Sequence, residues 1–216
     1  MRILFGNPPV RPGAGAAEDA GIRIRQPGPW TSAILAALAG FILLTAAVAV
    51  SIAYSILVPE SEAGGTIPKQ AIPWVGMLIS FILCIPAHEL LHAVLYPDHG
   101  LSDSTLLFVG WKKLQFGVYF EGRIPRARWI LMRLFPLLVL TILPLGVYLL
   151  AYRQLNFAWE SYLMIVLLTN SLGSGGDLVA AIIVWLQVPA AGVLNFYRGR
   201  AYWSEPRSPV AAALLK

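Results

Sequence analysis

Four long apolar segments limit the folds that this chain can adopt. They cover residues 30–58, 71–96, 129–152 and 159–187. About 20 apolar residues suffice to cross a bilayer as a helix, so each segment is long enough for one transmembrane span. The whole chain is 57% hydrophobic and only 12% charged, which is too apolar for an ordinary soluble domain. The sequence therefore predicts an all-α membrane protein with four transmembrane helices.

Lysine and arginine are concentrated on one side of the predicted membrane domain. The N-terminal tail, the segment 98–128 and the C-terminal tail hold nearly all of them, whereas the loops around Lys69 and Arg153 hold one each. Because cytoplasmic loops are enriched in Lys and Arg, we expect a multi-pass protein of the cell membrane with both termini cytoplasmic. The expected partner is the lipid bilayer and not nucleic acid, since the net charge of +5 comes without a basic run interleaved with aromatic residues.

The same pattern divides the chain into three parts. Residues 1–29 are rich in Gly, Pro and Arg without apolar periodicity, so we expect a flexible basic tail. No apolar core follows its start, so we do not expect a signal peptide. Residues 30–203 form the expected membrane domain, and residues 204–216 form a C-terminal tail.

The polar segment between the second and third spans carries a predicted β-hairpin. Residues 105–109 and 114–120 contain the β-branched and aromatic residues typical of strands, and residues 110–113 have the composition of a turn. We expect this small hairpin on the cytoplasmic side. There it either offers an edge strand to an extended substrate segment or only covers the mouth of a site.

A short histidine motif lies within the second apolar segment. The residues His88-Glu89-Leu90-Leu91-His92 spell H-E-x-x-H. On a helix the two histidines project from one face, where their imidazoles can hold one Zn²⁺, and Glu89 beside them can act as a catalytic base. Ionisable groups inside a span are costly, so they indicate a functional site. Alternatively, the histidines only satisfy backbone carbonyls within a helix bundle.

A catalytic zinc usually has three protein ligands, so the motif needs a further residue. Asp98, His99 and Asp177 are the candidates. His88 lies about 17 residues into the second span and Asp177 about 18 residues into the fourth, so at about 1.5 Å per residue both reach one depth. We therefore favour Asp177 over Asp98 or His99. Cys84, one turn before His88, is more typical of a small buried side chain than of a thiolate ligand.

The residues around Asp177 allow more than one interpretation. Asn170 lies two turns earlier on the same face, where it binds a substrate carbonyl, orients a metal ligand or holds helices together. Gly173, Gly175 and Gly176 either allow close helix packing or let the backbone open so that the carboxylate turns toward the metal.

The H-E-x-x-H motif at residues 88–92, followed in a later span by Asn170 and the sequence SGGD at 174–177, resembles a known family. It is the family of small bacterial membrane proteins called putative zincin peptidases, and the chain is also distantly similar to the site-2 protease intramembrane metalloproteases. The resemblance covers roughly residues 73–203. Asp177 is followed by Leu178, where the site-2 motif has Gly, and here the glycines precede the aspartate.

The resemblance implies that His88, His92 and Asp177 bind Zn²⁺, that Glu89 is the catalytic base, and that Asn170 corresponds loosely to the site-2 asparagine. We therefore expect an integral-membrane zinc metalloprotease that hydrolyses peptide bonds in or near the membrane at its cytoplasmic side. The alternative is a non-catalytic, metal-binding membrane adaptor or scaffold protein. A metal transporter is disfavoured because the other spans carry no acidic pathway.

Overall fold

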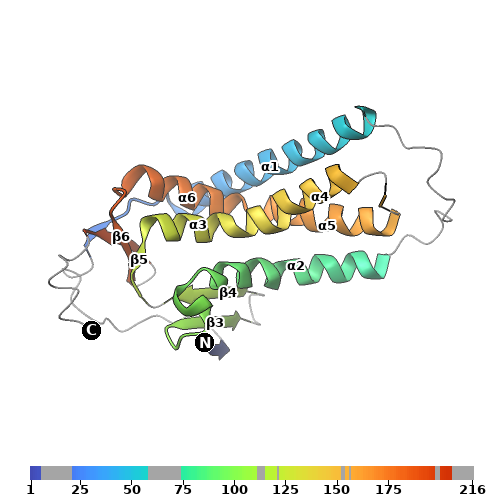
Figure 1. The fold of residues 1–216 in the computed structure, drawn as a ribbon. Coiled ribbons are helices and arrows are strands. Elements are labelled where there is room, and N and C mark those ends of the chain that lie inside the picture. The colour runs from blue at the N-terminus through green and yellow to red at the C-terminus, as the bar shows by residue number, and fades with distance from the viewer. Residues whose placement is uncertain are drawn as a thin grey trace. The chain divides into compact units, whose positions relative to one another are not determined.

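The computed structural model describes residues 1–5, 21–57, 74–110, 115–120, 122–151, 154–155, 157–197 and 200–205. Residue contacts divide the chain into two compact units. We call Gly28–His92 with Leu134–Val179 the helical unit, and Met1–Pro27, Ala93–Arg133 and Ala180–Lys216 the sheet unit. The elements in Figure 1 are β1 Arg2–Phe5, β2 Ile22–Arg23, α1 Pro29–Leu57, α2 Trp74–Val94, the 3₁₀ helix η2 Pro97–Gly100, β3 Thr105–Gly110, β4 Gln115–Phe120, β5 Ile124–Pro125, α3 Arg126–Leu137, the π-helix η4 Leu138–Ile142, α4 Leu143–Ala151, α5 Phe157–Gly173, α6 Gly175–Gln187, β6 Val193–Tyr197 and β7 Arg200–Ser204.

Within the described part of the chain, three helices are long and apolar enough to cross a membrane. They are α1, α2 and the continuous helix Arg126–Ala151, which α3, η4 and α4 form together. The first three predicted apolar segments are thus confirmed as helices of spanning length. The fourth is instead a broken pair, because α5 and α6 meet at Ser174 with a bend of 44° and pass the same test only together.

The helical unit is held together by close backbone contact between α1 and the broken pair. Within this unit α1, α4 and α5 lie side by side (Figure 1). A Cβ atom added at Gly40 of α1 would meet the carbonyl oxygen of Leu172, and one added at Gly175 would meet the carbonyl oxygen of Ala36 and the amide of Gly40. Small residues let helix backbones approach, so of the glycines near Asp177, Gly175 serves packing. The space around Gly173 is open.

A π turn interrupts the third apolar helix. Pro136 and Pro144 lie on either side of this turn, and neither has a backbone N–H to donate. Between them η4 widens the helix, and the Leu143 amide donates to the Leu138 carbonyl, five residues back. Such π turns frequently occur at functional sites.

The described residues of the sheet unit form two small β-sheets. In the first, β3 and β4 are antiparallel, with Thr105 opposite Phe120, and β1 pairs in parallel with the other edge of β3. The two predicted strands are therefore present as β3 and β4. Of the predicted turn 110–113, Gly110 ends β3 and residues 111–113 lie outside the described residues. The second sheet has the order β2-β7-β6-β5, and all of its strands are antiparallel.

The expectation of an all-α protein with a single hairpin was therefore incomplete. Residues 2–5 and 22–23, which we expected in a flexible tail, are strands. The N-terminal ammonium group donates to the Leu101 carbonyl at 2.7 Å, and Arg2 Nε donates to the Asp103 carbonyl at 2.7 Å. These contacts hold the start of the chain beside β3. A strand of four residues is too short to show a periodic sequence pattern, so the sequence did not predict it.

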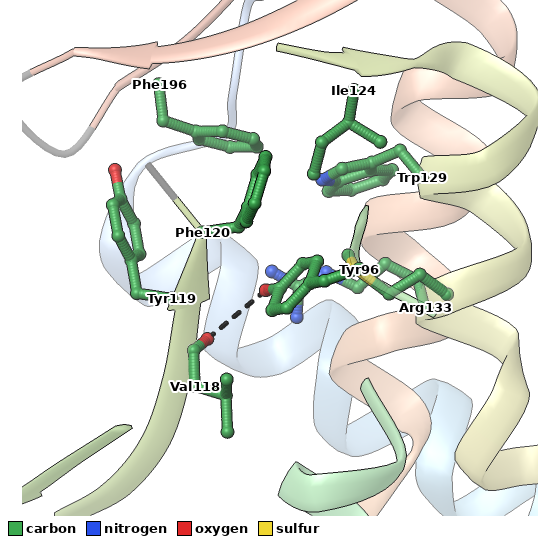
Figure 2. Close-up of a pocket in the computed structure, with 9 residues that line it drawn as sticks. Tyr96, Val118, Tyr119, Phe120, Ile124, Trp129, Arg133 and Phe196 are labelled. Carbon is green, nitrogen blue, oxygen red and sulfur yellow. Dashed lines mark hydrogen bonds between the residues drawn. The ribbon is translucent and has the colours of Figure 1, made fainter. Parts of the chain in front are cut away.

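The core of the sheet unit surrounds a small aromatic cavity of about 40 Å³. Phe120, Trp129 and Phe196 lie around it in Figure 2, and the hydroxyl of Tyr96 donates to the Val118 carbonyl at 3.4 Å. Arg133 also lines the cavity, with its guanidinium 5.1 Å from the centre of the Trp129 ring. A cation over an indole face is favourable, so Arg133 is held by this ring within the unit.

We predict that Gly175→Ala destabilises the protein by about 1–3 kcal/mol, because its methyl group would overlap the α1 backbone. The matched control is Gly173→Ala, since a methyl group there meets nothing within 4 Å. Thermal unfolding of both variants in detergent measures the difference. Equal unfolding temperatures would contradict the close approach of α1 to Gly175.

Candidate metal centre

The H-E-x-x-H motif lies on α2, near the C-terminal end of that helix. His88, Glu89 and His92 each offer one ligand atom, and these three atoms lie within 4.8 Å of one another. The two imidazole rings meet edge to face, with centroids 4.9 Å apart. His92 is 3% exposed, whereas His88 and Glu89 are half-buried. The helix thus presents a compact group of metal-binding atoms at partly shielded positions.

Asp177 completes this group from another part of the chain. Its Oδ2 atom lies 2.8 Å from His88 Nε2 and 3.3 Å from His92 Nε2. All three residues belong to the helical unit. A tetrahedral zinc site with bonds of about 2.1 Å places its ligand atoms about 3.4 Å apart. Two imidazoles and a carboxylate therefore fit a zinc ion in their chemistry. The 3.3 Å contact matches this spacing, and the 2.8 Å contact is shorter, at the distance of a direct hydrogen bond.

The break between α5 and α6 places Asp177 where a carboxylate is favoured. Because α6 begins at Gly175, Asp177 lies in its first turn. The free amides at a helix N-terminus carry partial positive charge and stabilise an anion there. Asp177 is only 8% exposed, so this stabilisation acts on a nearly buried group.

Asn170 contacts the opposite side of the His88 ring. Its Oδ1 atom lies 2.7 Å from His88 Nδ1. Its Nδ2 atom donates to the carbonyl of Pro136 at 2.9 Å and contacts the hydroxyls of Thr141 and Ser174 at 2.9 and 3.1 Å. The structure therefore brings together all five residues predicted for the site: His88, Glu89, His92, Asn170 and Asp177. Pro136 and Thr141 were not predicted for the site, because the π turn beside them has no signature in the sequence. Ser174 was noted only as part of the SGGD sequence at 174–177.

The other candidate ligands have different surroundings. Cys84 is buried in the helical unit, and its Sγ contacts the Val166 carbonyl at 3.9 Å. Asp98 and His99 belong to the sheet unit, where they lie exposed in η2 with left-handed backbone angles. Of the proposed third ligands, Asp177 is thus the one whose carboxylate contacts both motif histidines.

A family model described as "Putative zincin peptidase" matches residues 81–191, just over half of the chain. The matched segment contains both motif histidines, Glu89, Asn170 and Asp177. No curated protein and no solved structure matches the chain.

We predict that the detergent-purified protein contains about one zinc per chain, and that His88→Ala and Asp177→Ala each abolish this content, because a three-ligand site loses a third of its donors. Metal analysis after zinc-replete growth and dialysis measures it. Asp98→Ala and His99→Ala are the matched controls and should retain zinc. If Asp177→Ala keeps zinc and one of the controls loses it, the residue changed in that control is the third ligand instead of Asp177.

Proposed function

Because the chain belongs to the putative zincin peptidase family, we propose that it is an integral-membrane zinc metallopeptidase that hydrolyses peptide bonds in or near the membrane. The observation that carries this proposal is the contact of one Asp177 oxygen with Nε2 of both motif histidines. It joins the motif to a carboxylate far along the chain, as a three-ligand site requires.

The hydrogen-bond pattern of His88 supports a cation at this position. The Pro136 carbonyl can only accept, so the NH₂ group of Asn170 faces it and the amide oxygen faces His88. Both ring nitrogens of His88 thus face oxygen acceptors, at 2.7 and 2.8 Å. A neutral imidazole has only one N–H and cannot donate to both. A positive species is needed at Nε2, either a second proton or a metal ion, and the adjacent motif residues favour the metal.

Each residue of the site has its own role in the proposed peptide-bond hydrolysis. His88, His92 and Asp177 would hold zinc, which supplies a Lewis acid that acidifies water and polarises a scissile carbonyl. Glu89 is the general base: it takes a proton from the attacking water and returns one to the leaving amine. Asn170 orients His88 through its Nδ1 atom, as a partner of a metal-binding histidine commonly does.

The same proposal places the site in a bilayer with both termini cytoplasmic. Its support is the excess of Lys and Arg in the two tails and in the segment 98–128. The substrate would be a membrane protein or a peptide segment near the cytoplasmic surface. Its backbone must be extended at the cleaved bond, because a helical peptide bond is shielded by its own hydrogen bonds.

The open edges of the sheet that contains the hairpin belong to β1 and β4, and not to β3 and β4 as in a two-stranded hairpin. Because β3 pairs with both β1 and β4, an extended substrate segment would add to the outer edge of β4 or of β1. The strands that could pair with a substrate segment are therefore β4 and β1, and not β3.

We predict that Glu89→Gln keeps zinc and abolishes cleavage, because it removes the base and leaves the three metal-binding side chains in place. Membranes from cells that express wild type or Glu89→Gln are compared by mass spectrometry of newly formed protein N-termini. Termini present only with the wild type identify cleavage and its substrates.

The matched control is Glu160→Gln, a half-buried glutamate in the first turn of α5. It should produce the same termini as the wild type. If Glu89→Gln also matches the wild type while zinc is bound, the peptidase proposal is wrong and the non-catalytic adaptor is favoured.

A further inference from the structure

The NH₂ group of Asn170 faces three buried oxygen atoms on its side away from His88, and its two N–H groups are shared among them. Its Nδ2 atom lies 2.9 Å from the Pro136 carbonyl, 2.9 Å from Thr141 Oγ1 and 3.1 Å from Ser174 Oγ. Asn170, Thr141 and Ser174 are 2%, 3% and 1% exposed. In such a dry environment hydrogen bonds are strong and an unmade one is costly, so the orientation of the amide is fixed.

This orientation determines which nitrogen of His88 can bind a metal. Because the amide oxygen can only accept, the proton of a neutral His88 lies on Nδ1. The lone pair is then on Nε2, the nitrogen that faces Asp177. An imidazole with the opposite tautomer would present a proton to the metal instead of a lone pair.

The π turn explains why Pro136 and Thr141 both contact Asn170. In a regular α-helix, residues five apart point in directions that differ by about 140°. A π turn pairs residues five apart, so it brings residue 141 toward the side of residue 136. Pro136 lies two residues before η4, and Thr141 lies within it and is buried. The widened turn thus lets a carbonyl and a hydroxyl from one helix contact one amide.

We propose that the π turn Leu138–Ile142 is a positioning element of the metal site, and that Thr141 is its positioning residue. Thr141 fixes Asn170, Asn170 fixes the tautomer of His88, and His88 then presents Nε2 to zinc. This inference rests on the proposed zinc site. It adds a residue that acts through Asn170 and does not itself bind the metal.

The test measures zinc affinity of the purified full-length protein by competition with a chelator of known affinity. We expect Thr141→Val to weaken zinc binding about 3–10-fold, as loss of one hydrogen bond predicts. Thr141→Ser should restore binding because it returns the hydroxyl. Asn170→Ala should weaken binding about 10–100-fold, the usual effect of losing the partner of a metal-binding histidine.

A second measurement distinguishes a role of Thr141 in orienting the metal ligand from a role in helix packing alone. Cobalt bound in place of zinc reports the ligand geometry through its visible absorption, which should change in Thr141→Val and recover in Thr141→Ser. Thr45→Val is the matched control, since the Thr45 hydroxyl bonds only to carbonyls of its own helix α1. It should leave both zinc affinity and the cobalt spectrum unchanged.

The outcomes distinguish this inference from the proposed function. Wild type that binds no zinc would overturn both. Wild type that binds zinc, with the same affinity and cobalt spectrum in Thr141→Val, would overturn the positioning role alone, even if that variant unfolds at a lower temperature. If Asn170→Ala fails to fold, the Thr141 variants by themselves decide the positioning role.

Discussion

The helical unit depends on the Asp177 carboxylate, whose negative charge needs a partner because the group is nearly buried. An unpaired charge in such a place is expensive, and Asp177 is only 8% exposed. Its partners are the Nε2 atoms of two histidines one helical turn apart. Other features of the unit help to make this contact possible: the break at Ser174, the glycine contact between α1 and α6, and the π turn that orients Asn170.

The break between α5 and α6 contributes to this contact in two ways. An unbroken helix would carry Asp177 in its interior, where all neighbouring amides are used and no positive helix end faces the carboxylate. Starting α6 at Gly175 places Asp177 in a first turn, and the same glycine allows the α1 backbone to approach. One short sequence therefore serves both helix packing and charge stabilisation, which is why neither interpretation of the glycines alone was sufficient.

The sequence predicted which residues lie together at the candidate site, but it did not predict the residues that hold them in place. The motif spacing identified His88 and His92, and counting residues along two spans selected Asp177, since helix rise is constant. The strands β3 and β4 were predicted because six residues suffice to show the β-branched and aromatic composition of a strand. The two-residue strands β2 and β5 are too short to show such a composition. The π turn depends on which groups pack against it, and its sequence LVLTI is an ordinary apolar run.

The distribution of side chains on α2 argues for a lipid environment around the site. Cys84, His88 and His92 are four residues apart and form the shielded stripe of the helix. On its other faces α2 exposes large apolar side chains, among them Leu78, Ile82 and Ile85. A helix in water buries its apolar face and exposes its polar one, so α2 shows the reverse arrangement. Such a helix is stable where the surrounding medium is apolar and the polar groups find partners within the protein, which is what Asp177 and Asn170 provide.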